Sequence, residues 1–203
     1  MALYRMVEQG HHPTALITTV NAGQKRSWFH GISNELMQDV SNSMGIPLIL
    51  CECTPDNYTQ AYEHGLGKAR EMGADACVFG DIDIDEHKLW NEERCKKAGL
   101  SCILPLWKLN REALVHEVLD SGFKAVIKTI DSRKLDVSFL GQDLTAALIA
   151  DIKAVGVDPC GENGEYHTFV YDGPIFARPV PFITGEAVDL GTHKAIELRS
   201  VII

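Results

Sequence analysis

Apolar runs alternate with amphipathic segments through the first half of the chain. Runs of strand length stand at residues 14–20, 46–53 and 74–80. Segments with apolar residues at helical spacing follow them, at residues 32–45, 57–73 and 85–99. Strand and helix in alternation are typical of right-handed crossovers on a parallel sheet. The pattern therefore predicts an α/β fold in this half.

Cap residues support these helices. Ser33 stands where an N-terminal cap is needed for the 32–45 helix. Glycines that can end a helix in the left-handed conformation follow all three, at Gly45, Gly73 and Gly99. The predicted helix ends thus agree with the apolar spacing.

The pattern changes after residue 104, where we place a domain boundary that gives domains at 1–103 and 104–203. The predicted elements are a helix at 111–121, a strand at 124–130, a helix at 143–154 and a strand at 165–171. The tail, 180–203, has the alternation of antiparallel strands with a turn near Asp189 to His193. The second half therefore reads as a smaller α+β domain.

The chain opens on ALYRMVEQG, which predicts a short helix closed by Gly10. A doubly wound sheet normally opens with a strand and a phosphate-facing turn. A nine-residue helix is also marginal without packing partners. We therefore expect a strand and a loop upstream of this helix.

Composition narrows the class of protein. The 203 residues are 45% hydrophobic and 23% charged, enough for a sizeable core, and the net charge of -9 disfavours nucleic acid as a partner. The six cysteines include no CxxC pair, which favours reduced thiols in a cytoplasmic protein. No apolar run approaches the roughly 18 residues of a membrane span. We expect a cytoplasmic protein with no membrane partner.

The stretch GDIDIDEHKLWNE, residues 80–92, places carboxylates at the end of a predicted parallel strand. Its acidic spacing resembles an EF-hand loop, but Glu86 stands where that loop requires glycine. Residues just past such a strand line the ligand crevice of open α/β sheets. Asp81 and Asp83 would then face a ligand or a magnesium ion, with Gly80 allowing close approach. The alternative is a set of solvated acids with Asp85 capping the next helix.

Two further motifs have a structural and a functional interpretation. In RSWFHG, residues 26–31, His30 beside Trp28 and Phe29 is either a packed histidine or, from its place at a strand end, a binding residue. In CEC, both sulfurs of Cys51 and Cys53 lie on one face of a strand. With no third and fourth ligand nearby, these two are expected to be core cysteines.

The stretch CGENGEYHTFVYDGP, residues 160–174, is dense in ionisable groups. If residues 165–171 are extended, one strand face holds Glu165, His167, Phe169 and Tyr171, and the other holds Tyr166, Thr168 and Val170. A carboxylate at Glu165 beside the His167 imidazole is a general acid/base arrangement. The expectation is a functional loop and strand, with glycines that bring Glu162 and Asn163 to a ligand.

With these residues in view, the chain resembles the diphthine ammonia ligase family, a branch of the PP-loop (N-type) ATP pyrophosphatases. The similarity covers essentially the whole chain and is densest in GVDPCGENGEYHTFVYDGPIF at 156–176. The other matching pieces are ALYR at 2–5, WFHG at 28–31, GDI at 80–82, EHKLWNEERC at 86–95, AGL at 98–100, LPLW at 104–107 and FLGQDL at 139–144.

The resemblance implies a HUP-type Rossmann-like parallel sheet that binds ATP, followed by a smaller C-terminal α+β domain with the ENGEYHT motif. The implied reaction is adenylation of a carboxylate, helped by Mg²⁺, followed by amination with ammonia. Nucleotide-binding residues would be His30, Gly80, Asp81, Ile82 and Glu92. The acceptor side would use Glu162, Glu165 and His167 as catalytic residues and Asn163, Gly164 and Thr168 to bind substrate. The resemblance does not identify which residues would bind a metal ion. It is compatible with a homodimer.

Two departures from the family pattern leave alternatives open. The family's SGGKDS phosphate loop should stand immediately before ALYR, where this chain has only Met1. This chain also has NGEYHT where eukaryotic ligases have a form resembling GGEYET. The acceptor would be diphthine on elongation factor 2 in an archaeal or eukaryotic source and unknown in a bacterial one. The alternative function is a nucleotide-binding module or pseudoenzyme. A tRNA-thiolating relative would need a cysteine pair and a basic surface, and the sequence has neither.

Overall fold

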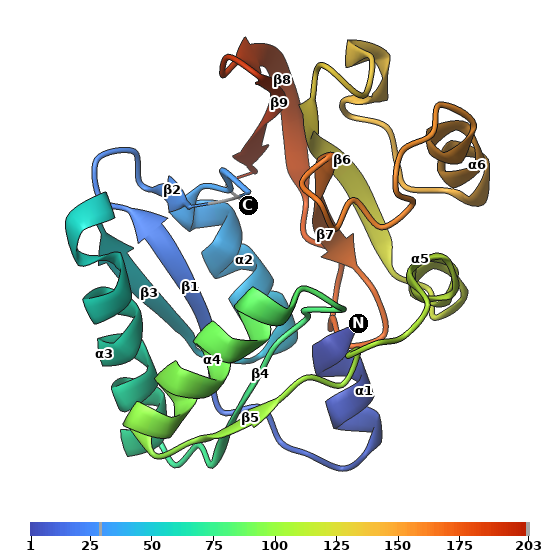
Figure 1. Cartoon of the computed structure of the whole chain (residues 1–203). Coiled ribbons are helices and arrows are strands. Elements are labelled where there is room, and N and C mark those ends of the chain that lie inside the picture. Colours follow the sequence, from blue (N-terminus) through green and yellow to red (C-terminus); the bar gives the residue numbers. More distant parts are fainter. Residues whose placement is uncertain (29, 202–203) are drawn as a thin grey trace. The chain divides into compact units, whose positions relative to one another are not determined.

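The computed structural model of the chain describes residues 1–28 and 30–201 (Figure 1). The chain divides into two compact units. Unit 1 comprises Met1–Trp28 and Met44–Leu109, and unit 2 comprises Phe29–Ser43 and Asn110–Ile203. Phe29 of the WFHG motif and the last two residues of the predicted tail lie outside the described residues.

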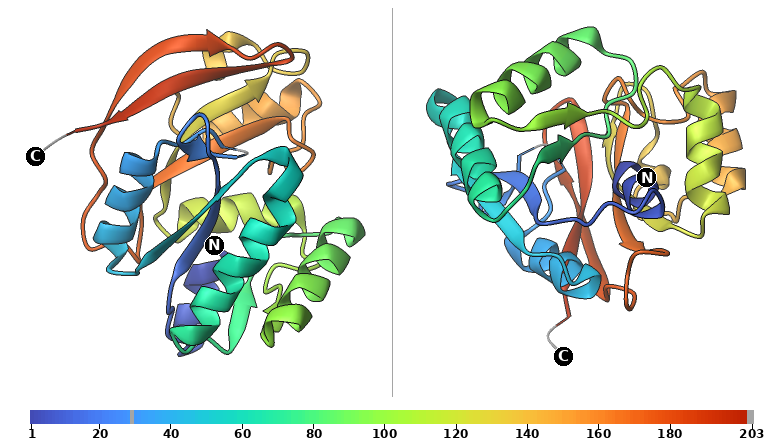
Figure 2. Two further views of the ribbon diagram at one scale, coloured as in Figure 1. Left: turned by 90° about the vertical axis from the view of Figure 1, so that its left-hand side faces the viewer. Right: turned by 90° about the horizontal axis from the view of Figure 1, so that it is seen from below.

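Unit 1 contains parallel strands and the helices that cover them. Its elements are α1 (Ala2–Glu8), β1 (Leu16–Asn21), β2 (Arg26–Ser27), β3 (Leu48–Cys53), η1 (Pro55–Asn57), α3 (Tyr58–Glu71), β4 (Ala76–Val78), α4 (Asp85–Ala98) and β5 (Ser101–Ile103). The pair β1 and β3 is parallel, as is the pair β4 and β5, while β2 adds an antiparallel edge to β1. The parallel strands form two sheets, ordered β2-β1-β3 and β4-β5, with α3 and α4 side by side (Figure 2). The arrangement is consistent with a Rossmann-like fold.

Small side chains let α3 approach β3 closely. A Cβ added at Gly65 of α3 would stand 2.2 Å from the sulfur of Cys51. Cys51 and Cys53 are both buried, and burial together with the neighbouring Cys53 raises the pKa of Cys51 to about 11. The interpretation of CEC as a pair of core cysteines is confirmed, because neither is exposed and both sulfurs are free thiols.

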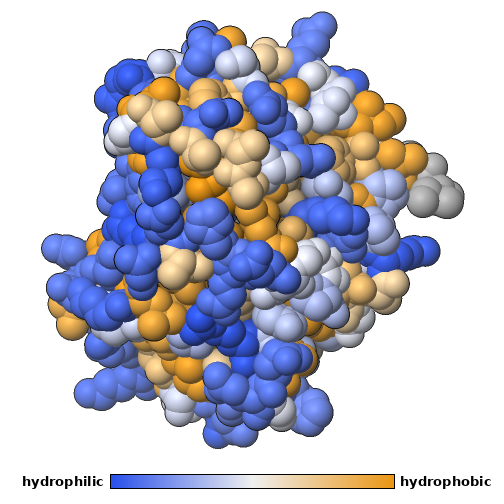
Figure 3. Space-filling model, turned by 90° about the vertical axis from the view of Figure 1, so that its right-hand side faces the viewer, coloured by the Kyte–Doolittle hydropathy of each residue, from blue (hydrophilic) through white to orange (hydrophobic). Residues whose placement is uncertain are grey.

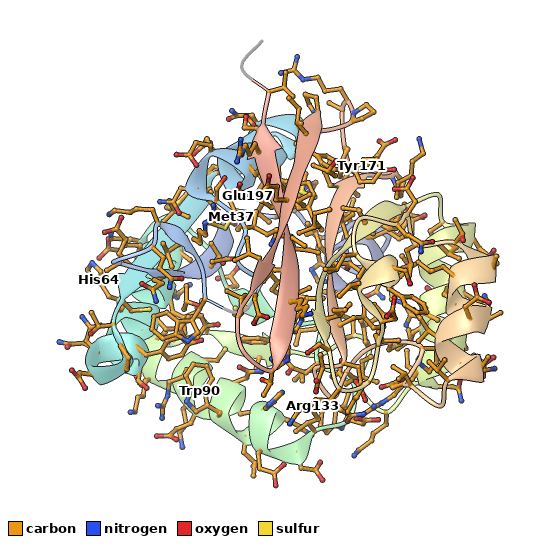
Figure 4. All side chains as sticks on the ribbon, turned by 90° about the horizontal axis from the view of Figure 1, so that it is seen from above. Met37, His64, Trp90, Arg133, Tyr171 and Glu197 are labelled. Atoms are coloured by element: carbon orange, nitrogen blue, oxygen red, sulfur yellow. The ribbon has the colours of Figure 1, made fainter. Side chains whose placement is uncertain are left out.

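Unit 2 is built on an antiparallel sheet. Its elements are α2 (Asn34–Met44), α5 (Arg111–Asp120), β6 (Lys124–Asp131), η2 (Val137–Phe139), α6 (Ala146–Ala154), β7 (Tyr166–Asp172), β8 (Phe182–Asp189) and β9 (His193–Ser200). The strand order is β7-β6-β9-β8, and every pair is antiparallel. Figure 4 shows Arg133, just past β6, and Tyr171, near the end of β7, at opposite ends of this sheet.

Hydrophobic clusters cover both faces of that sheet. One contains Ile127 and Ile130 of β6 with Ile149 and Ile152 of α6. The other contains Leu36 of α2 with residues from three strands, namely Val126, Phe169 and Leu198. The helix α2 connects two strands of unit 1 but packs in unit 2, because its apolar stripe matches the apolar face of the antiparallel sheet.

The predicted helix ends are confirmed in detail. The Leu36 backbone N–H donates to Ser33 Oγ at 3.3 Å, and positive φ angles of 67°, 100° and 68° occur at Gly45, Gly73 and Gly99. The suggestion that Asp85 caps its helix is wrong, because α4 begins at Asp85 after Ile84, which makes no side-chain cap. The strand β5 was not predicted, since three half-exposed residues are too short to show alternation.

The surface of the described residues combines hydrophobic and hydrophilic side chains. Figure 3 shows hydrophobic residues scattered among hydrophilic ones on one face of the molecule. The edge strand β8 and its turn expose Ile183, Val188 and Leu190. Of the helices within residues 1–28 and 30–201, none is long and apolar enough to cross a membrane.

Candidate functional site

The first candidate residues follow the carboxyl end of β4 in unit 1. At Gly80 an added Cβ would have no described heavy atom within 4 Å beyond the two chain neighbours, so the backbone there faces open space. Both carboxylate oxygens of Asp81 are engaged by α4, because Oδ1 lies 3.1 Å from His87 Nδ1 and Oδ2 accepts from Asn91 Nδ2 at 2.9 Å. Since a carboxylate only accepts, the proton of His87 sits on Nδ1. Asp81 is thus held in a fixed orientation.

The loop after β5 is fastened to the loop after β4 through Lys108. Its N–H donates to the Ile82 carbonyl at 2.6 Å, and its ammonium lies 3.3 Å from the Asp83 carbonyl and 3.5 Å from Asp85. Lys108 has a φ of 60°, an uncommon conformation for a residue with a side chain. The Ile82 side chain is buried, so it anchors this loop within unit 1.

Glu92 lies on the exposed side of α4. Its carboxylate is 3.8 Å from the ammonium of Lys88, one helical turn earlier. Lys88 and Lys108 both lie over the Trp107 ring, 5.0 and 4.7 Å from its centroid. The structure therefore groups Glu92 with surface cations, whereas Asp81 is tied to buried Asn91.

The motif loop of unit 2 is held by Asp158. Its carboxylate accepts from the backbone N–H groups of Cys160, at 3.0 Å, and Glu162, at 3.2 Å, and it forms an ion pair with Arg111. Gly161 has a φ of 65°, and a Cβ there would stand 2.8 Å from the Tyr166 carbonyl oxygen. The loop needs glycine at that position for both reasons.

Glu165 is buried at the start of β7, with 4% of its surface exposed. Its carboxylate accepts from Lys134 Nζ at 3.2 Å and from the N–H and side-chain amide of Asn163 at 3.1 and 3.3 Å. Burial alone would raise the pKa of Glu165, but the hydrogen bonds from its own N–H, Lys134 and Asn163 lower it overall. Glu165 is an ionised anchor for the loop.

His167 packs against His30 rather than bonding to Glu165. The two imidazole centroids are 4.8 Å apart with planes at 66°, and His30 also forms a hydrogen bond to the Thr168 backbone. Burial, and then the neighbouring His30 and His193, lower the pKa of His167 to about 4. The expected carboxylate–imidazole pair is replaced, within the part of the chain that the structure describes, by a pair of imidazoles.

The structure thus groups the predicted residues differently from the sequence. His30, expected beside the nucleotide residues, lies in unit 2 with the motif, whereas Gly80, Asp81, Ile82 and Glu92 lie in unit 1. The strand faces are as expected, with Phe169 and Tyr171 on one side and Tyr166 and Val170 on the other. Asn163 is exposed and Gly164 has a φ of 82°, so the loop turns outward there.

Sequence reasoning missed Lys128 and His193. Lys128 has 3% of its surface exposed, and its ammonium lies 4.0 Å from where a Gly31 Cβ would stand. His193 pairs in register with Asp131, whose buried carboxylate is bound by the backbone and guanidinium of Arg133. The sequence signal for Lys128 was available, because a lysine inside the apolar run KAVIKTI is unusual and lysine is rarely buried unless it is paired.

Two family models match the chain, one in each half. The diphthamide synthase N-terminal domain model matches residues 1–102, and the diphthamide synthase C-terminal domain model matches residues 110–189. The chain belongs to this family, whose curated relatives are named diphthine–ammonia ligase. The Mus musculus protein of that name is 37% identical over 145 residues, covering 69% of this chain and 54% of the relative.

Two other relatives extend the comparison. The Bos taurus protein of the same name is 32% identical over 152 residues, covering 72% of this chain and 55% of the relative. The Danio rerio protein is 25% identical over 210 residues, covering 92% of this chain and 82% of the relative. The chain therefore spans about half the length of the mammalian relatives it matches.

Proposed function

We propose that the chain is an ATP-dependent ligase that converts a carboxylate of its acceptor into an amide. In the first step the carboxylate displaces pyrophosphate from ATP and becomes an acyl adenylate. In the second step ammonia displaces AMP, and the extra proton on nitrogen leaves to give the neutral amide. Family membership across both domain models carries this proposal. The names of the relatives suggest diphthine on an elongation factor as the acceptor.

In this proposal each unit binds a different substrate. We assign the nucleotide to the strand end of unit 1, where Gly80 leaves the backbone open and Asp81 is fixed by α4. Mg²⁺ is commonly held by one or two carboxylates together with phosphate oxygens, and it offsets phosphate charge. Asp81 and Glu92 are the proposed partners.

We assign the acceptor to the motif of unit 2. His167, with its lowered pKa, is a neutral imidazole near pH 7 and can accept a hydrogen bond or a proton. Glu165 keeps the loop in place, and Glu162 and Asn163 stand on the outer part of that loop. The role of Glu165 in this proposal is therefore positional, and proton transfer falls to His167.

The test is formation of AMP and amide from ATP, Mg²⁺, ammonium and elongation factor 2 bearing diphthine. His167→Ala should lower the rate of AMP formation about 100-fold, the lower end of general acid–base effects. His64→Ala, an exposed histidine on α3, is the matched control and should keep the full rate. Calorimetric binding of ATP without any AMP formation would instead support a nucleotide-binding module.

A further inference from the structure

We propose that Cys77 and Cys95 of unit 1 form a reversible redox site, in which a peroxide oxidises Cys77 and the Cys95 thiol then closes a disulfide. The substrate of this site is a hydroperoxide, and an external dithiol returns both cysteines to the thiol form. The inference is independent of the proposed ligase function, because it uses neither ATP nor an acceptor.

Three thiols from three different elements meet in the core of unit 1. Cys77 of β4 and Cys102 of β5 are in-register partners on neighbouring parallel strands. Cys95 of α4 belongs to the same hydrophobic cluster, and β5 lies next to both β4 and α4 (Figure 1). The Cys95 thiol is within hydrogen-bonding distance of both other sulfurs. All three are free thiols, so the structure holds the reduced form of the site.

The two sulfurs of the proposed bridge differ in acidity. Cys77 accepts hydrogen bonds from the Cys95 thiol and from the Tyr62 hydroxyl, and these contacts lower its pKa in spite of burial. The same hydrogen bond to Cys77, and then burial, raise the pKa of Cys95. The thiolate is the nucleophilic form of cysteine. Cys77 is therefore the sulfur that attacks, and Cys95 keeps its proton until the second step.

The more acidic thiol is also the more accessible one. Cys77 is half-buried, whereas Cys95 has 1% of its surface exposed, so an oxidant from solvent meets Cys77 first. Oxidation-sensitive cysteines are typically accessible, low in pKa and placed beside a second cysteine that resolves them. The pair has all three properties. Burial raises the pKa of Cys102, so Cys77 is the more reactive of the two half-buried thiols.

Both steps balance without any further reactant. In the first step the Cys77 sulfur attacks one peroxide oxygen, so that an S–O bond forms and the O–O bond breaks. The proton of Cys77 goes to the departing oxygen, which leaves as an alcohol or as water, and Cys77 becomes a sulfenic acid. In the second step the Cys95 sulfur attacks that of Cys77, the S–S bond forms, and the S–O oxygen leaves as water with the Cys95 proton. The two sulfurs together lose two electrons, and the peroxide gains them.

The bridge would connect the two elements that hold Asp81. Cys77 precedes Asp81 in the chain, and Asn91 and Cys95 are about one turn apart on α4. Asn91 donates a hydrogen bond to the Asp81 carboxylate, as described above. A disulfide between Cys77 and Cys95 therefore closes a loop of the chain that contains both Asp81 and the residues that orient it.

The test is peptide mapping by mass spectrometry after the full chain has been treated with hydrogen peroxide and its remaining thiols alkylated in denaturant. The wild-type chain should lose two of its six thiols together and yield a peptide containing Cys77 linked to one containing Cys95. Dithiothreitol should restore all six. Cys95→Ala should leave Cys77 as a sulfenic acid that dimedone captures. A linkage that includes Cys102 instead, or no linkage, would overturn the proposal.

Control variants separate this pair from ordinary cysteine oxidation. Cys160 is also half-buried, but its thiol donates to the Arg111 carbonyl and burial raises its pKa to about 12, so Cys160→Ser should form the bridge at the wild-type rate. Cys102→Ser should also keep the bridge. Tyr62→Phe removes one hydrogen bond to Cys77 and should slow the loss of thiols by roughly 3- to 10-fold, the range of a single hydrogen bond. Equal rates in Tyr62→Phe and wild type would contradict the activation of Cys77.

Discussion

His167 shows how a residue's surroundings change its chemistry. An ordinary histidine titrates near 6.5, but burial and two neighbouring histidines lower the pKa of His167 to about 4. In the folded chain the ring stays neutral down to that pH, whereas in the unfolded chain it takes up a proton below about 6.5. The difference makes the free energy of unfolding depend on pH.

We expect this residue to destabilise the folded chain as the pH falls from 6.5 toward 4. The unfolded state binds the additional proton in that window, so the free energy of unfolding rises with pH there. Between pH 7 and pH 4.5, the free energy of unfolding of wild type should fall by about 2 kcal/mol more than that of His167→Gln. This figure allows for the partial exposure of the His167 ring. Urea unfolding of wild type and variant at both values measures it.

The matched control is His64→Gln on the exposed face of α3 (Figure 4). Because its side chain is exposed, this substitution should change the free energy of unfolding by less than about 0.5 kcal/mol at either pH value. If His167→Gln behaves in the same way as this control, the lowered pKa of His167 is wrong.

Individual residues of the motif also show what sequence patterns predict and what they do not. Alternation along residues 166–171 assigned the two strand faces correctly, because side-chain direction in a strand depends only on position. It did not find the partners of the motif's ionisable groups. Glu165 bonds to Lys134 and His167 packs on His30, and both partners come from other segments of the chain.

At the scale of elements, α2 is the clearest case of tertiary packing deciding the outcome. Its spacing predicted the helix, and Ser33 and Gly45 were placed correctly at its ends. Its partners could not be predicted, since an apolar stripe does not specify which sheet it covers. Leu36, Met37 and Val40 all pack into the cluster of unit 2.

We predict that Leu36→Ala lowers the free energy of unfolding by about 3 kcal/mol, because Leu36 is fully buried and its removal leaves a cavity. Leu89→Ala is the matched control, a helical leucine with 64% of its surface exposed, and should change stability by less than about 0.5 kcal/mol. Chemical denaturation of both variants provides the measurement. Equal effects of the two substitutions would contradict the packing of α2.

At the scale of the whole molecule, neither unit is a single continuous segment of the chain. Unit 2 takes residues 29–43 from within the span of unit 1, so the chain leaves unit 1 after β2 and returns for β3. Each unit has its own hydrophobic core: one cluster around Leu66 in unit 1, and two clusters in unit 2, of which the one around Leu198 contains α2. Segments that share a core tend to open together.

Hydrogen exchange should therefore report α2 with unit 2. We expect Leu198→Ala, in the cluster of unit 2 that contains α2, to speed exchange of the α2 amides more than that of the β3 amides. Leu66→Ala, a similarly buried substitution in unit 1, should do the reverse. Mass spectrometry on peptides from residues 34–44 and 48–53 resolves the two. If exchange of the α2 peptide changes in parallel with exchange of the β3 peptide in both variants, the assignment of α2 to unit 2 is contradicted.

The sequence by itself determined the local structure of this protein. Apolar spacing, caps and glycines located the longer helices and strands, because these signals act between residues a few positions apart. The density of ionisable groups at 160–174 predicts a functional loop, and the family models match both halves of the chain.

Only the tertiary structure decided which side chains meet. It split the parallel strands into two sheets, placed α2 and His30 in unit 2, and buried Lys128 beside Gly31. It also tied Asp81 to α4 and Glu165 to Lys134. The physical reason is that these contacts join residues distant in sequence, and their free energy depends on burial and charge that exist only once the sheets have formed.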